Sequence, residues 1–95
     1  MSKAIEALAA RLTPGTQMEC LENTNVAERK GAILTITEQG KRVLSGTVSE
    51  TRGGVAHRAE FGLELRAGLH MVDADTFRQP IERYGHSVTW RILVT

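Results

Sequence analysis

The chain has 95 residues, 41% of them hydrophobic and 24% charged, which is enough for one compact core and too little for two. Its formal net charge of +1 argues against a large non-specific field for DNA or anionic membranes, although a local basic patch is compatible with it. Cys20 is the only cysteine, and neither a secretory leader nor a long apolar run is evident, so we expect a single cytoplasmic domain over residues 1–95 without membrane association.

Residues 3–12 are predicted to form a short amphipathic helix. Its apolar side chains recur at i, i+3, i+4 and i+7, namely Ile5, Leu8, Ala9 and Leu12. The Thr-Pro-Gly sequence at 13–15 ends it, because proline cannot continue the helical hydrogen bonds. So short a helix needs an apolar surface. We expect it to cover one open end of the barrel; docking to a partner or self-association is the alternative.

Strands are expected from residue 16 onward. "TQMECLE" places Met18 and Cys20 on one side, and a loop follows it. The segments "AILTITE" and "KRVLSGTV" form a hairpin through "QG", where Gly40 is expected to supply a positive φ. Residues 49–54, "SETRGG", are expected to be a loop.

The second half of the chain contains two further strands. "VAHRAEFGLELRAG" alternates, and its expected core face consists of Val55, His57, Ala59, Phe61, Leu63 and Leu65. Residues 73–85 are compatible with one helical turn or with an irregular strand interrupted by Pro80, and we favour an irregular segment containing one turn. "HSVTWRILVT" closes the chain as a strand, with these side chains facing inward: Val88, Trp90, Ile92 and Val94.

The fold class that follows is mainly β. One short helix precedes about five strands without alternating helices, which favours antiparallel pairing in a small barrel or curled sheet over residues 16–95. Gly31 would let the chain enter a strand at a bend, and Gly46 would mark a bulge or a barrel corner.

The segment 29–46 also resembles a known family. Gly31, Ile33 and Ile36 give the spacing G-x-aliphatic-x-x-I, with a turn Gly40 and a second Gly46 behind it. This is similar to the KOW segment of Src-homology-3-like small barrels, which occur in ribosomal and transcription proteins. The small size of the chain also resembles short barrels among phage or plasmid accessory proteins. The resemblance implies a barrel that binds nucleic acid or a nucleic-acid-associated protein.

Basic side chains in the expected loops are the candidate binding site. If the barrel closes, two or three of these loops gather at one rim, and phosphate binding follows. The candidate residues are Arg29, Lys30, Lys41, Arg42 and Arg52. Acidic residues in the same loops favour the alternative, in which these basic side chains are ordinary solvated charges that bind nothing.

Other reactive side chains lack a coherent pattern. The spacing of Cys20, His57, His70 and His86 does not match common zinc sites. Cys20 is expected to be inert core packing rather than a nucleophile, and His57 a hydrogen-bonded core or boundary residue. Asp73, Asp75 and Glu82 are typical of capping and turns rather than of acid–base catalysis.

We therefore expect a non-catalytic binding module with no metal or cofactor. Its leading function is recognition of nucleic acid or a nucleic-acid-associated protein. A protein-interaction or structural role, including a homo-oligomer formed through the helix or an exposed sheet face, is the alternative. A small enzyme with a site between subunits is a third, minor one.

Overall fold

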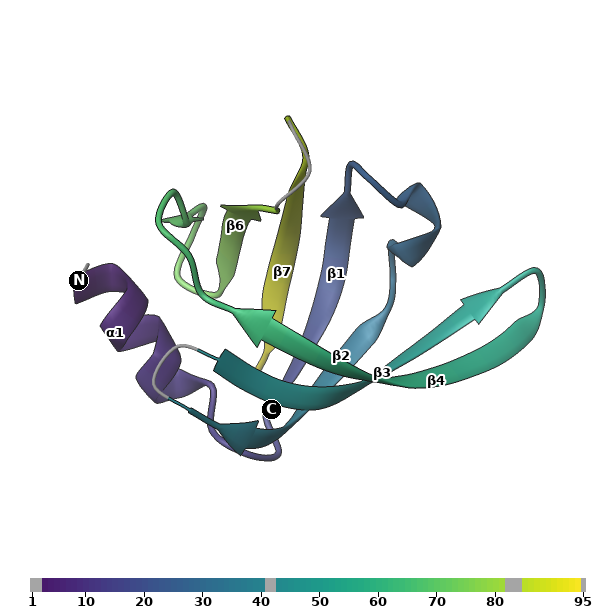
Figure 1. Ribbon diagram of the computed structural model, residues 1–95, viewed down its shortest axis with the longest axis horizontal. Helices are drawn as coiled ribbons and strands as arrows, with labels where there is room; N and C mark the ends of the chain where they lie inside the picture. The colour runs from purple at the N-terminus through teal and green to yellow at the C-terminus, as the bar shows by residue number, and fades with distance from the viewer. Residues whose placement is uncertain (1–2, 41–42, 82–84, 95) are drawn as a thin grey trace.

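The computed structural model describes residues 3–40, 43–81 and 85–94, with Arg52 described by its backbone alone. In these ranges a short helix is followed by seven strands in one sheet (Figure 1). The elements are α1 (Lys3–Arg11), β1 (Gln17–Asn23), the 3₁₀ turn η1 (Ala27–Arg29), β2 (Ile33–Gln39), β3 (Val43–Arg52), β4 (Val55–Glu64), β5 (His70–Met71), β6 (Thr76–Pro80) and β7 (Ser87–Leu93). The fold is mainly β with an N-terminal helix, as predicted, but it has seven strands where about five were expected.

All strand pairings are antiparallel, in the order β4-β3-β2-β1-β7-β6-β5. The sheet curls, so that β3 and β4 cross in front of β1 and β7 in Figure 1. The side chain of Gln79 on β6 reaches the backbone oxygen of Glu64 on β4, at 2.9 Å. The end strands β4 and β5 are not paired with each other, so the described part of the chain is an open, curled sheet and not a closed barrel.

The β2–β3 hairpin is present, with glycines at its critical positions. Gly31 precedes β2 with a φ of 91°, and a bulge in β2 lies opposite Gly46. The expectation for Gly40 was wrong, because its φ is not positive. A Cβ atom at Gly40 would lie 2.8 Å from the backbone oxygen of Val43, so close approach rather than backbone conformation requires glycine there.

The β3–β4 hairpin extends through residues expected to form a loop. β3 continues to Arg52, and β4 begins at Val55 directly opposite it. Gly53 and Gly54, with φ angles of 56° and 81°, form the intervening two-residue turn. Positive φ at both positions is the requirement of a type I′ turn, whose twist matches that of the flanking strands.

The first half of β4 does not have the buried face that its alternation predicted. Val55 is 58% exposed, and His57 and Ala59 are exposed as well. Burial begins with Phe61, which packs against the core, and with Leu63. Alternation identifies side chains that share a face, but here that face is covered only where β4 crosses the body of the sheet. The rest of the hairpin protrudes as a ribbon (Figure 1).

The C-terminal strands also differ from expectation in two places. Residues 76–80 form a strand rather than an irregular segment with a turn, and Phe77 on it is fully buried. Pro80 occupies the last position of this strand, where a missing N–H is tolerated. Val88, Trp90 and Ile92 are buried as predicted, whereas Val94 follows the end of β7 and is 70% exposed.

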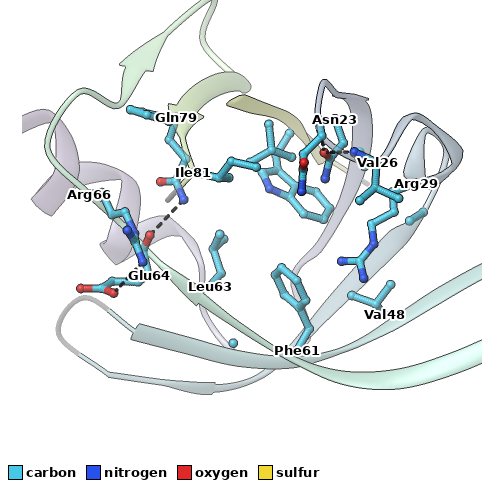
Figure 2. A pocket seen from close by; sticks show the side chains of 17 residues that line it. Asn23, Val26, Arg29, Val48, Phe61, Leu63, Glu64, Arg66, Gln79 and Ile81 are labelled. Carbon is cyan, nitrogen blue, oxygen red and sulfur yellow. Dashed lines mark hydrogen bonds and ion pairs between the residues drawn. The ribbon is translucent and has the colours of Figure 1, made fainter. Parts of the chain in front are cut away.

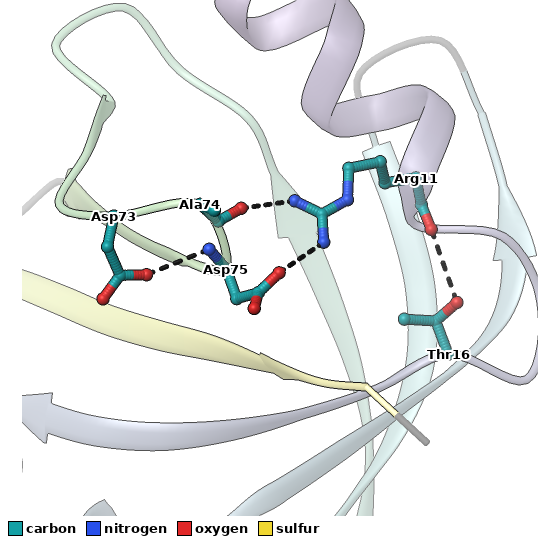
Figure 3. A network of polar contacts seen from close by, with 5 residues as sticks. All are labelled: Arg11, Thr16, Asp73, Ala74 and Asp75. Carbon is teal, nitrogen blue, oxygen red and sulfur yellow. Dashed lines mark hydrogen bonds and ion pairs between the residues drawn. The ribbon is translucent and has the colours of Figure 1, made fainter.

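Helix α1 lies against one end of the curled sheet (Figure 1). The predicted apolar stripe is buried, from Ile5 through Leu12. The side chain of Gln39 donates to the backbone oxygen of Ala9. The Arg11 guanidinium donates to the backbone oxygen of Ala74 and to the Asp75 carboxylate, the latter at 2.7 Å (Figure 3). These contacts fasten the end of α1 to β2 and to the turn before β6.

The helix stripe and the concave face of the sheet share one apolar core. Its largest fully buried side chains are Phe77, Leu12, Met18, Leu34, Ile36, Leu44, Leu65 and Cys20. None of the helices in the described ranges has the length and apolar character needed to cross a membrane.

Candidate binding pocket

A pocket of about 340 Å³ opens on the concave side of the sheet, between β4, the β1–β7 centre and η1 (Figure 2). Its walls combine apolar and polar side chains. The apolar lining comes from Val48, Phe61, Leu63, Ile81, Val88 and Trp90, and the polar lining from Asn23, Asn25, Arg29, Glu64, Arg66 and Gln79. An apolar cavity with a few placed polar groups is the usual composition of a small-molecule site.

Gln79 is a polar residue on the buried face of β6. It is 3% exposed and lies two positions after Phe77, on the same side of the strand. Its Nε2 donates to the backbone oxygen of Glu64, which fixes the side chain between β6 and β4. Within the described structure its Oε1 has no hydrogen-bond partner. Gln79 is therefore a pocket-lining residue that carries one buried, unpartnered acceptor.

Trp90 lies on β7 and is 4% exposed. Its backbone is opposite Cys20 on β1 and Phe77 on β6, so the ring projects from the middle of the sheet. The indole packs against Phe61, with ring centroids 6.1 Å apart and planes tilted by 58°. Among the described residues, no acceptor is bonded to its Nε1. The indole N–H is thus a buried donor without a partner among the described residues.

Arg29 ends η1, on the connection between β1 and β2. Asn23 shapes this connection, because its Oδ1 accepts hydrogen bonds from the backbone N–H groups of Asn25 and Val26, at 3.0 and 2.8 Å. Arg29 is half-buried, and its side chain enters the pocket toward Val48 and Phe61, on the side away from Gln79 (Figure 2). Its Nε is buried and has no partner in the described structure.

The lining of the pocket also includes an ion pair, Glu64 with Arg66, and the thiol of Cys20. Glu64 and Arg66 form an ion pair at 3.3 Å, with half of the Glu64 side chain exposed. Cys20 is 1% exposed, and burial raises the pKa of its thiol, although the nearby Arg29 charge acts in the opposite direction. A buried thiol of raised pKa is a weak nucleophile at neutral pH. The expected inert packing of Cys20 agrees with this environment.

The sequence-predicted basic residues do not share one described surface. Arg29 enters the pocket, and the adjacent Lys30 is exposed. Arg52 is the last residue of β3, at the tip of the protruding ribbon. Lys41 and Arg42 lie outside the described residues.

The other candidate residues are dispersed. His57 and His70 are exposed on β4 and β5, whereas His86 is half-buried with its Nδ1 3.1 Å from the Thr24 hydroxyl. Over the described ranges, no three His, Cys, Asp or Glu side chains are grouped as a metal site requires. Asp73 accepts a hydrogen bond from the Asp75 N–H at 2.9 Å, as expected for a turn. Glu82 is outside the described residues.

Sequence reasoning missed Gln79 and Trp90 as site residues. One signal was available: in "TFRQP", strand alternation puts Gln79 on the face of Phe77, and a polar residue on an apolar face needs a partner. The unused Trp90 N–H had no such signal, because tryptophan on an inward face is ordinary core composition.

Comparison with protein-family models, with curated proteins and with solved structures finds no match to this chain.

Proposed function

We propose that this protein is a non-catalytic binding module that holds a small amphipathic molecule in the pocket. The ligand has an apolar body and a head group that accepts hydrogen bonds, of which a carboxylate is the simplest. One observation carries the proposal: three buried polar atoms, on Arg29, Gln79 and Trp90, lack partners among the described residues and belong to side chains that line the same cavity.

The cost of these atoms favours a ligand that bonds to them. A buried donor or acceptor without a partner costs about 1–3 kcal/mol, and most such groups in folded proteins are satisfied. The pocket volume of about 340 Å³ is within the range of roughly 300–1,000 Å³ that is usual for small-molecule sites. A bound molecule that reached these buried atoms would supply the missing bonds and cover the apolar walls at once.

The polar groups also select the ligand's chemistry. Arg29 and Trp90 are donors, and the guanidinium is charged, so together they favour an anionic acceptor. Gln79 offers an acceptor on the other side of the pocket, suited to a hydroxyl or N–H group of the ligand. Phe61 and Leu63 lie between these polar groups and suit an aliphatic or aromatic body.

Octanoate, octan-1-ol and octylamine test this selectivity with one apolar chain and three head groups. Trp90 is the single tryptophan and lines the pocket, so its fluorescence reports occupancy directly. We expect octanoate to change the fluorescence saturably and to raise Tm, because a ligand that binds only the folded state stabilises it. Octan-1-ol should bind at least about tenfold more weakly, since charge-assisted hydrogen bonds contribute roughly 1.5–3 kcal/mol.

Arg29→Gln and Lys30→Gln form a matched pair, because both remove one positive charge from adjacent positions and only Arg29 lines the pocket. We expect Arg29→Gln to weaken octanoate binding about tenfold or more while changing octan-1-ol binding little. Lys30→Gln should bind both as the unmodified protein does. Equal losses in the two variants, or no saturable octanoate binding, would contradict the proposal.

Recognition of nucleic acid through Arg29, Lys30, Lys41, Arg42 and Arg52 stays a prediction, as does the resemblance to KOW-containing barrels. Its signature is affinity for a labelled duplex that falls with salt, with a logarithmic slope of about −0.9 per phosphate contact. Neutralising Lys41, Arg42 and Arg52 together should remove that affinity without changing octanoate binding. Salt-independent or absent duplex binding would exclude this function.

A further inference from the structure

The two edges of the sheet differ greatly in length. At one end β5 has two residues, whereas β4 at the other end has ten. Unpaired backbone groups along a long edge strand are a template for another strand. The first six residues of β4, Val55 to Glu60, are exposed, and this part of the strand stands clear of the body of the molecule (Figure 1). The edge is therefore accessible to a partner.

The turn determines which backbone groups of β4 are free. A type I′ turn joins residues 52 and 55 by hydrogen bonds, and bonded positions then alternate along an antiparallel pair. Odd-numbered residues of β4 thus bond to β3, and the even-numbered residues point their N–H and C=O groups outward. The backbone oxygen of Glu64 confirms this assignment independently, because it accepts a bond from Gln79 across the free edge.

The contact between Glu64 and Gln79 also limits the free edge. It occupies the end of β4, where the sheet curls toward β6. The outward-facing residues that remain are Ala56, Arg58, Glu60 and Gly62. Their midpoint is Ala59.

We propose that a second copy of this chain pairs with this edge, β4 against β4 in antiparallel orientation, about a two-fold axis at Ala59. This register uses all of the outward-facing backbone groups in both copies. It places Arg58 directly opposite Glu60 of the partner subunit, and by symmetry Glu60 opposite Arg58 of the partner subunit. Opposite charges at directly paired positions stabilise a sheet, and like charges destabilise it.

Charge complementarity distinguishes this register from its neighbours. Pairing requires outward-facing residues opposite each other, so the register shifts in steps that keep even positions aligned. One shift places Arg58 opposite its own copy, and the shift in the other direction places Glu60 opposite its own copy. Of these three registers, only the central one avoids a like-charge contact and gives two contacts between opposite charges.

The side chains at the axis permit close approach. Ala59 meets its own copy there, and Ala56 and Gly62 at the outer pairs are also small. Because the same surface is used by both copies, the contact closes at a dimer. The two sheets join into one continuous sheet, and the edges that remain exposed are the short β5 strands.

Sedimentation velocity over a concentration series tests the proposal on the full chain. We expect the unmodified protein to reach twice the mass of one chain as its concentration rises. Arg58→Glu and Glu60→Arg should each weaken self-association at least tenfold, because each makes both paired contacts repulsive. Glu38→Arg, on exposed β2 surface, makes the same change in net charge as Glu60→Arg and should leave the dimer intact.

Mixing the two charge-reversal variants provides the decisive measurement. An acidic edge then faces a basic edge, so the mixture should form a heterodimer that neither variant forms alone. The double variant, with both charges exchanged, should dimerise as the unmodified protein does. A monomer at every concentration, a larger oligomer, or a dimer insensitive to both reversals would overturn the proposal.

Discussion

Gly46→Ala tests whether the strand pairing around the β2 bulge requires a missing side chain. Gly46 lies in β3 opposite Ile36. A Cβ atom there would be 2.4 Å from the backbone oxygen of Thr35 and 2.8 Å from Cδ1 of Leu34. The oxygen would have to retreat by about 0.6 Å to reach the 3.0 Å limit of real Cβ contacts. Because Thr35 belongs to the neighbouring strand, the shift has to be made by backbone.

The magnitude follows from two opposing effects. Overpacking typically costs 1–3 kcal/mol, and a rigid backbone contact favours the upper end of that range. Alanine recovers roughly 0.5–1 kcal/mol because it loses less conformational entropy than glycine on folding. We expect a net loss of about 2 kcal/mol in the free energy of unfolding. At 4–8 °C per kcal/mol for a domain of this size, Tm falls by roughly 8–16 °C.

Gly62→Ala is the matched control, because Gly62 also lies inside a strand and a Cβ atom there meets nothing within 4 Å. Urea unfolding followed by Trp90 fluorescence measures both variants. Gly62→Ala should be neutral or more stable by up to about 1 kcal/mol. If Gly46→Ala is as stable as the unmodified protein, or if both variants lose the same stability, the steric argument is wrong.

Two further predictions concern ionisable groups. Cys20 should react with a thiol reagent only as fast as the protein unfolds, because its side chain is 1% exposed and burial raises the pKa of its thiol. Rapid labelling of the folded protein would show that the thiol is accessible from the pocket and would contradict this prediction. The hydrogen bond from the Asp75 N–H, assisted by Thr76, lowers the pKa of the Asp73 carboxyl. The stabilising contribution of the Asp73 carboxylate is therefore present above the unfolded-state pKa of about 3.9, and it is lost as pH falls through the lower folded-state pKa. Asp73→Asn, which retains the accepting oxygen, should therefore lose less stability on acidification than the unmodified protein; identical urea midpoints across that pH range would contradict this assignment.

The sequence predicted those parts of the fold whose pattern reports burial directly. The spacing of Ile5, Leu8 and Leu12 identified the helix, and inward-facing Met18 and Trp90 identified strands at the centre of the sheet. In each case an apolar face coincides with the core, so periodicity and packing agree.

The missed features arise where tertiary contacts decide. Alternation in "VAHRAEF" continues past the point where anything covers the strand, so Val55 and His57 were wrongly placed in the core. The polar residues around Gly53 and Gly54 predict a loop, although two adjacent glycines are also typical of a hairpin turn. The pocket was not predictable, since Arg29, Gln79 and Trp90 come from three separate segments that only the curl of the sheet brings together.

The pairing of β1 with β7 determines how this molecule assembles. Every other strand pair joins neighbours in the chain, whereas this pair joins residues as distant as Gln17 and Leu93. Closing so long a segment has the largest entropic cost, and such non-local contacts slow folding. The hairpins within β1 to β4 and within β5 to β7 can form early, because each joins neighbouring strands. The shared core forms only after β1 pairs with β7. The cooperativity between the two parts of the sheet therefore depends on one pair of strands, and a substitution that breaks this pairing would divide the sheet into two incomplete halves.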